Sequence, residues 1–443
     1  MVKFLESLLA VAIIGGAVVS GNTIKAECGK DVGKCPENKP CCSQYSQCGI
    51  GAYCLGGCDS KFSFKLESCV PAPVCQNKAT TFESGIDSVV SIYEYLGDAS
   101  KADWVAEGKP VAWDGKLLLT MPPDSVGTVL SSTHYVWYGR VSATMKTSRG
   151  AGVVSAFILF SGVKDEIDFE WVGVNLHNVQ SNYYFQGIPV YTNGGNHTVD
   201  GGSTYDEYHT YDIDWTPDSI TWHVDGKVIR TKYKKDTWNE ETKNYDFPQT
   251  PSRVQLSLWP GGLPTNAEGT IEWAGGVIDW NHPDVKEAGY YYATVKELKI
   301  ECYDPPADAK KKGSKSYIYG DESGLESSVI ISDKPYILKS FLGSGTDLDK
   351  EPPKSTTTSN GGSQPTDVVE TIPGNNGGGT STHDIIETGG NTDNSTSGNT
   401  DTGSGDTTTT QKVGFTQDST GDAFKVKGSM MAVAVAIAGL VIV

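Results

Sequence analysis

Two successive stretches of the chain, Tyr211-Asp-Ile-Asp-Trp215 and Ser219-Ile-Thr-Trp-His-Val-Asp-Gly226, alternate apolar and polar residues. Arg253-Val-Gln-Leu-Ser-Leu-Trp259 has the same period of two. Because successive side chains of a β-strand point to opposite faces, this period indicates strands with one buried face. Similar short segments, bounded by Gly, Asn, Asp and Pro, run from residue 81 to about residue 304 with no long helical period between them. They predict an all-β fold, a jelly-roll sandwich that we assign to residues 76–304.

One predicted strand, Asp165-Glu-Ile-Asp-Phe-Glu-Trp171, carries Glu166, Asp168 and Glu170 on a single face. Neighbouring carboxylates repel one another, so the pattern favours a cation or a reaction that uses them. A solvated acidic face and a calcium site are the alternatives. Retaining glycosidases hold two carboxyl groups about 5–5.5 Å apart, one to attack the anomeric carbon and one to protonate the leaving oxygen. Glu166 and Glu170 form such a pair if the strand bends, with Asp168 between them to tune the pKa values.

Nine of the ten cysteines lie between Cys28 and Cys75. About fifty residues build too small a hydrophobic core to be stable alone. In a secreted chain this density therefore predicts a disulfide-rich module, which we assign to residues 21–75. A zinc site is the alternative, but the region contains no histidine and an oxidising compartment disfavours free thiolates. No metal site and no cofactor are predicted.

The N-terminus has the form of a secretory signal peptide. Lys3 precedes an apolar run that ends in small residues, which is the typical order of charged, apolar and cleavage regions. We predict cleavage after Ser20, so that residues 1–20 are removed, and cleavage after Ala26 is the second possibility. A buried helix is the structural alternative.

The C-terminal part is polar until its last residues. Residues 351–410 contain 23 Ser or Thr and 11 Gly in 60 positions, too few apolar side chains to offset chain entropy, and we assign residues 305–419 to a disordered Ser/Thr/Gly-rich stalk. The apolar residues 430–443 are fewer than the ~20 that span a bilayer. With a polar spacer and small residues before them, they predict a glycosylphosphatidylinositol (GPI) anchor on Ser419, or on Gly421, and removal of residues 420–443. A short tail anchor is the alternative.

The charge of the chain excludes nucleic acid as its main partner. Lys plus Arg number 36 and Asp plus Glu 54 in 443 residues, a formal charge of −18, whereas phosphate binding needs a basic face. The sequons that begin at Asn196 and Asn394 predict N-glycosylation of a secreted chain.

The cysteine run, with its core Cys41-Cys-Ser-Gln-Tyr-x-x-Cys48-Gly, resembles hevein-type chitin-binding modules (carbohydrate-binding module family 18) over residues 27–70. In that family a serine and three aromatic residues form a platform for N-acetylglucosamine, and the matching positions here are Ser43, Tyr45, Gln47 and Tyr53. Since Gln47 replaces an aromatic residue, the resemblance implies weaker chitin binding than in plant members; a purely structural knot is the alternative. It also implies the disulfides Cys28–Cys42, Cys35–Cys48 and Cys41–Cys54, and we expect the other cysteines to form Cys58–Cys69 and Cys75–Cys302.

Glu166-Ile-Asp168-Phe-Glu170 is similar to the catalytic signature of glycoside hydrolase family 16, whose members are β-jelly rolls. The resemblance implies that Glu166 is the nucleophile and Glu170 the acid/base. Residues 137–146, 208–215 and 258–262 extend the match. Together with the cysteine module, the stalk and the GPI signal, they make the whole chain resemble the fungal Crh cell-wall transglycosylases, which link chitin to β-glucan.

A second strand is expected to carry substrate contacts. In residues 253–259, alternation places Arg253, Gln255, Ser257 and Trp259 on one face, which we expect to line a concave groove. The resemblance to Crh enzymes implies chitin contacts for Gln255, Trp259 and Thr270. A core role is the alternative for Trp259.

These observations predict a secreted, GPI-anchored enzyme of the fungal cell wall and the outer face of the plasma membrane. It would cleave chitin with retention and transfer it to β-glucan, so its partners would be these two polysaccharides and, through the anchor, the membrane. Simple retaining hydrolysis of β-glucan or chitin is the alternative within enzymes. A non-catalytic chitin-binding wall protein is the alternative outside them, and the intact acidic triad speaks against it.

Overall fold

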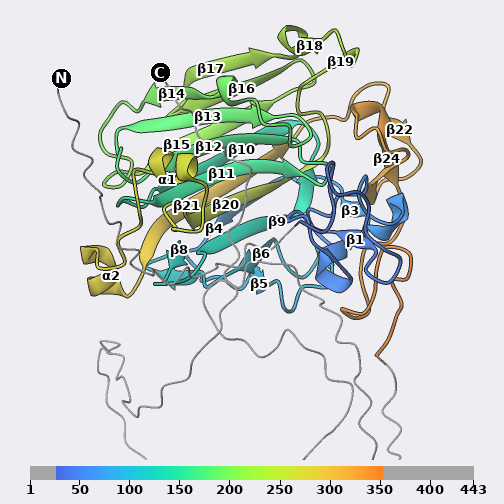
Figure 1. Ribbon diagram of the computed structural model, residues 1–443, viewed down its shortest axis with the longest axis horizontal. Coiled ribbons are helices and arrows are strands. Elements are labelled where there is room, and N and C mark those ends of the chain that lie inside the picture. The colour runs from blue at the N-terminus through green and yellow to red at the C-terminus, as the bar shows by residue number, and fades with distance from the viewer. Residues whose placement is uncertain (1–25, 353–443) are drawn as a thin grey trace, which may run out of the picture.

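The computed structural model of the chain describes residues 26–352 (Figure 1). Two eight-stranded sheets enclose one large apolar core, so the prediction of an all-β sandwich is confirmed. The predicted signal peptide, the sequon at Asn394 and the anchor site at Ser419 or Gly421 lie outside the described residues. None of the helices within residues 26–352 is long and apolar enough to cross a membrane.

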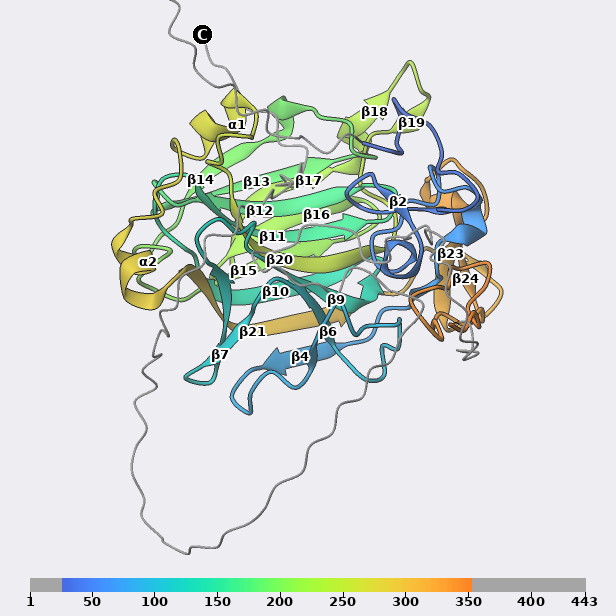
Figure 2. The same ribbon diagram turned by 60° about the horizontal axis from the view of Figure 1, so that its bottom comes forward.

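The first sheet, called the triad sheet because it contains the acidic strand β12, lies across the middle of Figure 2. Its strand order is β14 (Gly195–Thr198), β13 (Asn178–Tyr184), β12 (Glu166–Val172), β11 (Val153–Ser161), β20 (Ser252–Pro260), β9 (Thr128–Val136), β6 (Trp104–Glu107) and β5 (Val89–Ser91). The second sheet, called the back sheet, has the order β17 (Lys227–Tyr233), β16 (Ser219–Val224), β15 (His209–Trp215), β10 (Gly139–Lys146), β21 (Tyr291–Cys302), β8 (Lys116–Met121) and β7 (Val111–Trp113), and β4 (Lys78–Thr81) also pairs with β21.

Short elements occupy the connections. They are β18 (Trp238–Asn239), β19 (Asn244–Tyr245), α1 (Glu268–Trp273), α2 (Pro283–Ala288) and the 3₁₀ turns η3 (Tyr191–Asn193), η4 (Lys234–Thr237) and η5 (Glu326–Ser328). Helix α1 follows β20, the strand predicted to contact substrate.

The core fixes which way β12 faces. Ile167, Phe169 and Trp171 all enter it, and the rings of Phe169 and Trp171 meet Tyr211 of the back sheet edge to face, with centroids 5.6 and 4.5 Å apart. Burying a large apolar side chain contributes about 1.5–3 kcal/mol. A shift of one residue in register would lose these contacts, so the acidic residues between them face away from the core.

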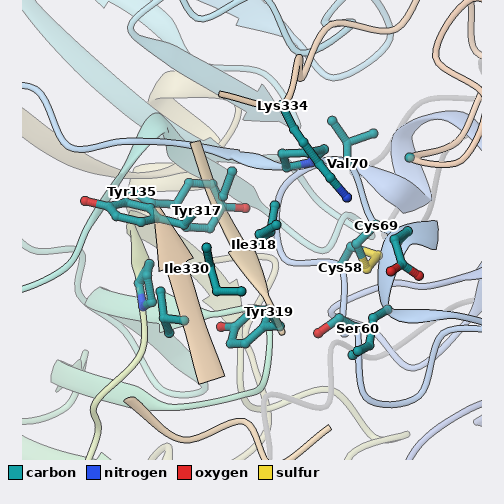
Figure 3. Close-up of a pocket in the computed structure, with 18 of the residues that line it drawn as sticks. Cys58, Ser60, Cys69, Val70, Tyr135, Tyr317, Ile318, Tyr319, Ile330 and Lys334 are labelled. Atoms are coloured by element: carbon teal, nitrogen blue, oxygen red, sulfur yellow. A yellow bond between two sulfur atoms is a disulfide. The ribbon is translucent and has the colours of Figure 1, made fainter. Parts of the chain in front are cut away.

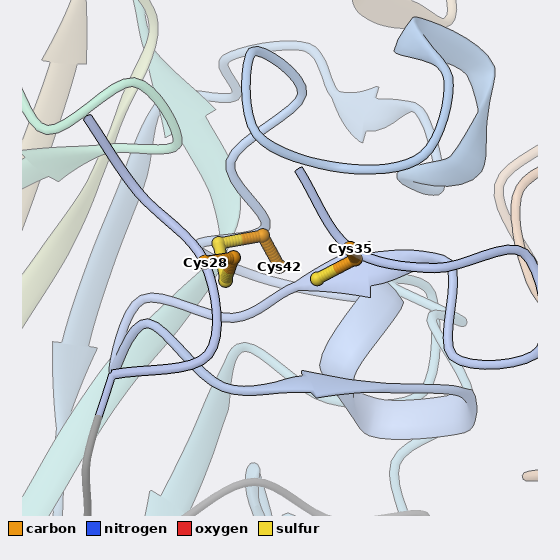
Figure 4. A group of neighbouring side chains, drawn as sticks. All are labelled: Cys28, Cys35 and Cys42. Atoms are coloured by element: carbon orange, nitrogen blue, oxygen red, sulfur yellow. A yellow bond between two sulfur atoms is a disulfide. The ribbon is translucent and has the colours of Figure 1, made fainter. Parts of the chain in front are cut away.

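The cysteine module contains β1 (Cys41–Cys42), β2 (Cys48–Gly49), η1 (Gly51–Cys54) and η2 (Leu66–Ser68). Its disulfides, together with the one that ties it to the end of β21, are the predicted set: Cys28–Cys42, Cys35–Cys48, Cys41–Cys54, Cys58–Cys69 and Cys75–Cys302. Figure 4 shows three of these cysteines, Cys28, Cys35 and Cys42, whose sulfur atoms lie within 4.8 Å of one another. Because each is bonded to another sulfur, none is a free thiolate for a metal.

The prediction that the stalk begins at residue 305 is wrong for residues 305–352. This segment, called the C-terminal extension, forms β22 (Lys310–Lys311), β23 (Ser316–Tyr319) and β24 (Val329–Ser332), and these join β3 (Ala72–Pro73) in a four-stranded sheet. Tyr317 and Ile331 enter the sandwich core, while Leu338 packs on the cysteine module. The extension folds because its apolar strands β23 and β24 have surfaces to cover, on β3 and on the sandwich core.

The extension, the module and the triad sheet meet around a cavity of about 220 Å³ (Figure 3). Tyr135 of β9, Tyr317 of β23, and Cys58 and Ser60 of the module line it. No residue of the acidic triad does, so this cavity is separate from the predicted catalytic residues. Its lining shows that the module packs directly on the sandwich.

Candidate active site

The structure places Glu166, Asp168 and Glu170 on one face of β12, opposite the core. Their exposed fractions are 6, 1 and 7%. Strands β11 and β13 pair with β12 on its two sides, and Trp222 of the back sheet donates its Nε1–H to the backbone oxygen of Asp168 at 3.0 Å. The triad therefore stands on a strand that is held from three directions, which suits groups that must keep a fixed separation.

Burial raises the pKa of all three carboxyl groups. Those of Glu166 and Glu170 lie well above 4.5, first because of desolvation and then because of repulsion by Asp168. Desolvation raises the pKa of Asp168 to about 7, although Arg230 and the backbone N–H of Asn182 lower it. Because close acids titrate together, ionising one keeps a proton on a neighbour. The site can thus hold a proton near neutral pH, as a general acid must.

Two oxygens of the triad, Asp168 Oδ1 and Glu170 Oε1, are buried without a hydrogen-bond partner among residues 26–352. Buried polar atoms nearly always have one. The neighbouring carboxylate of Asp165, by contrast, has hydrogen-bond partners for both of its oxygens. It accepts bonds from two backbone N–H groups and from the Thr250 hydroxyl. The contrast favours a triad that is retained for a ligand or a reaction.

Strand β13 adds polar side chains that the sequence analysis missed. Its register sets them opposite the triad in the pairs Glu166 with Tyr184, Asp168 with Asn182 and Glu170 with Gln180. Asn182 donates its Nδ2–H to the Tyr184 hydroxyl at 2.7 Å. These groups can hydrogen-bond sugar hydroxyls, but only the fold reveals that β13 is the neighbour of β12.

The predicted contacts on β20 lie on the same face as the triad. Gln255 is in register with Ile158 of β11, which is in register with Asp168. In the same way, Ser257 shares a cross-strand row with Glu170. The predicted face of β20 and the triad are therefore brought together.

Trp259 lies at one border of this face and stacks on Trp273 of α1, with ring centroids 6.0 Å apart and an interplanar angle of 24°. It belongs to a small cluster apart from the main core. Trp273 also donates its Nε1–H to Gln180 Oε1 at 2.9 Å, so it reaches from β20 towards β13. Thr270 lies in the same helix and is 7% exposed. Trp273 is a candidate sugar contact that the sequence analysis missed.

The predicted chitin platform of the module is not an open surface in this structure. Tyr53 is 2% exposed and packs against Gly49, and Tyr45 donates its hydroxyl to Glu107 of β6 at 2.8 Å. Ser43 is also 2% exposed, and its Oγ accepts the backbone N–H of Gln47. Stacking on a sugar needs a free ring face. In this structure Tyr53 and Tyr45 make contacts within the protein instead. Chitin binding by the module stays a prediction.

The sequon residue Asn196 is exposed on the edge strand β14, in register with Gln180. Its side-chain oxygen accepts the Nδ2–H of Asn178 at 3.1 Å. A glycan on Asn196 would therefore stand at the edge of the triad sheet.

Residues 98–275 match the profile of glycosyl hydrolases family 16. The chain is 55% identical to Crh-like protein 2 of Aspergillus fumigatus over 349 residues, and this match covers 79% of the chain and 78% of that protein. It is 48% identical over 329 residues to Congo red hypersensitive protein 2 of Saccharomyces cerevisiae, covering 74% and 69%. The solved structure of Crh5 transglycosylase in complex with NAG is 32% identical, with a TM-score of 0.48, and covers 59% of this chain and 94% of its own. The chain belongs to the fungal Crh-like proteins of glycosyl hydrolase family 16, a family of cell-wall glycosidases and transglycosylases.

Proposed function

We propose that the protein is a retaining transglycosylase that cleaves the β-1,4-linked N-acetylglucosamine chain of chitin and transfers it to β-glucan, thereby cross-linking the fungal wall. The observation that carries the proposal is the triad on one buried face of β12, with two oxygens lacking partners among the described residues. Membership of the Crh-like family supports it.

In the first step, protonated Glu170 donates its proton to the glycosidic oxygen while ionised Glu166 attacks the anomeric carbon. The carbon–oxygen bond breaks and a glycosyl ester forms on Glu166. In the second step, the Glu170 carboxylate takes the proton of an acceptor hydroxyl, whose oxygen displaces Glu166. Two inversions retain the configuration, and the charge of Asp168 tunes the pKa values of both glutamates.

The acceptor decides between transfer and its alternative, hydrolysis. If water displaces Glu166, the protein is a retaining hydrolase. The deciding experiment incubates the protein with chitin oligomers and a labelled β-glucan oligosaccharide and measures the products. A labelled conjugate supports the proposal, while shortened chitin alone indicates a hydrolase. No product from either sugar would indicate the third possibility, a chitin-binding wall protein.

Replacing Asp168 with Asn is expected to move the alkaline limb of the kcat/KM profile to lower pH. The negative charge of Asp168 raises the pKa of both Glu166 and Glu170, so its removal lets Glu170 lose its catalytic proton sooner. The activity loss near the optimum should be smaller than for either Glu variant, because Asp168 only orients and tunes. A limb that stays in place or moves to higher pH would contradict this role.

Stability offers an independent check on the same residue. The folded-state pKa of Asp168 is about 7 against an ordinary value of 3.8, so the folded protein binds more protons than the unfolded chain between these values. Its contribution to the free energy of unfolding therefore falls as pH rises through this window. Urea unfolding of Asp168→Asn should show a weaker decline from about pH 4 to about pH 7 than the wild type. An equal decline would show that folding does not raise the pKa of Asp168.

We propose further that the mature chain is held at the cell surface by a GPI anchor at Ser419, with residues 353–419 as a glycosylated stalk. The short apolar tail and the small residues before it support this. Phosphatidylinositol-specific phospholipase C is expected to release the protein from intact cells. Detection of a peptide from residues 433–443 in the mature protein would show instead that the tail is retained.

A further inference from the structure

The turn at residues 44–46 of the cysteine module, called the 44–46 turn, lies on the face of the triad sheet that carries the triad. Gln44 accepts the Nε2–H of Gln255 through its Oε1 at 3.0 Å, and Tyr45 donates its hydroxyl to Glu107 at 2.8 Å. Ser46 accepts the Nζ–H of Lys164 at 2.7 Å. Figure 2 shows the blue module against one end of the strands of this sheet. The turn is thus a contact of the catalytic sandwich itself.

The position of the turn relative to the triad follows from the strand register. Gln255 stands two strands from Asp168 in one cross-strand row, and Glu107 stands four strands from Glu170 in the next. At about 4.8 Å per strand these separations are about 10 and 19 Å. A polysaccharide that crosses the strands over the triad towards β6 therefore meets the 44–46 turn after a short run of sugar rings.

The turn is held too firmly to be a loose flap. Its flanking residues Cys42 and Cys48 are both in disulfides. A Cβ on Gly56 would lie 2.0 Å from Nη1 of Arg253, so the module backbone sits directly on this β20 guanidinium. The backbone N–H of Gly57 donates to the Tyr135 hydroxyl at 3.0 Å. These contacts fix the module at several points around the turn.

The β13 side of the triad has no comparable contact with the module among residues 26–352. There β13 presents the partly exposed side chains of Gln180 and Asn182, and the edge strand β14 follows. No residue of the module contacts these side chains through a hydrogen bond in residues 26–352. The triad face is therefore bounded by the module on the β20 side and continues to the sheet edge on the β13 side.

We propose that the 44–46 turn is a specificity-determining wall, which limits how many sugar residues bind on the β20 side of the triad. Gln44 and Gln255, joined by their amides, would meet the end of the bound segment, and Tyr45 would block the path beyond. The inference rests on the proposed function, because it assumes a polysaccharide on this face. The module then acts as part of the active site, in addition to any affinity for chitin.

The test uses the full secreted chain with the double substitution Gln44→Ala and Tyr45→Ala, and chitin oligomers of increasing length as substrates. Mass spectrometry measures the lengths of the product segments, and kinetics give the kcat/KM ratio of the longest to the shortest oligomer. In the wild type, one of the two product segments should have a fixed upper length. In the double variant that limit should rise and the kcat/KM ratio should increase several-fold.

Two matched variants control the experiment. Tyr45→Phe keeps the ring and loses the hydroxyl that donates to Glu107, so it should retain the wild-type length limit. Glu37→Gln changes an exposed residue of the same module and should behave as the wild type. Thermal unfolding and intact mass establish that each variant is folded and has its disulfides.

Unchanged product lengths in a folded double variant would overturn the proposal. So would a variant that loses only its binding to insoluble chitin, because the turn would then act as an ordinary binding surface. If the wild type cleaves β-glucan oligomers but not chitin, the proposed donor is wrong, and the same length series in β-glucan decides the inference. If it acts on neither, both proposals fail.

Discussion

Replacing Glu166 with Gln is expected to reduce both transfer and hydrolysis by at least about 10³-fold, because the covalent step loses its nucleophile. Gln has nearly the same shape as Glu, so the strand should keep its packing. The pKa of Glu166 is raised by burial and by Asp168, which means that its ionised form opposes folding. The variant should therefore be at least as resistant to thermal unfolding as the wild type at neutral pH.

Trapping of the intermediate identifies the nucleophile directly. A slow fluorinated substrate should leave a covalent sugar on the wild type, and peptide mass spectrometry should place it on Glu166. The Glu166→Gln variant is the control and should remain unlabelled. A label on Glu170 would reverse the two roles and leave the reaction class intact. A loss of less than tenfold in both Glu variants would contradict the assignment altogether.

The second large effect is expected for Glu170→Gln. Without a proton donor, cleavage of natural glycosidic bonds should fall by about 10²–10⁴-fold. A glycosyl fluoride should still load Glu166, because fluoride leaves with little need for protonation. The variant should therefore lose far more activity on oligosaccharides than on the fluoride, and that ratio is the measurement.

The same ratio separates catalysis from structural damage. Asp168→Asn, a neutral substitution on the same face, should lower activity on both substrates by similar factors. Equal losses on oligosaccharide and fluoride for Glu170→Gln would mean that Glu170 is not the acid. Addition of a small external nucleophile such as azide should speed turnover of the fluoride-loaded variant, since deglycosylation by water also needs Glu170 as base.

Local sequence pattern was enough to predict which side chains share a strand face. Alternation along residues 165–171 assigned Glu166, Asp168 and Glu170 to one face, because strand geometry depends only on neighbouring residues. The same period identified Gln255 and Trp259 on one face of β20. The resemblance to a known cysteine spacing implied three of the disulfides, and the other two were expected for the remaining cysteines. All five are present.

The C-terminal boundary of the folded part could not be predicted from local sequence. Residues 305–352 precede a polar segment and were assigned with it, yet Tyr317 and Ile331 pack into the sandwich core. Whether a short apolar strand folds depends on the surface that other segments offer it, here β3 and the core. That surface is assembled by residues hundreds of positions away, and no window of sequence contains it.

By itself, the sequence of this protein determined the all-β class and the acidic face of β12, because alternation acts over a few residues. Only the tertiary structure decided what surrounds the triad. It set Asn182 and Gln180 beside the acids, brought Trp273 onto Trp259, and turned Tyr45 of the module inward to Glu107. The pairing of β13 with β12, the packing of α1 on β20 and the packing of the module on β6 make these contacts, so strand order and domain packing, rather than local propensity, place them at the site.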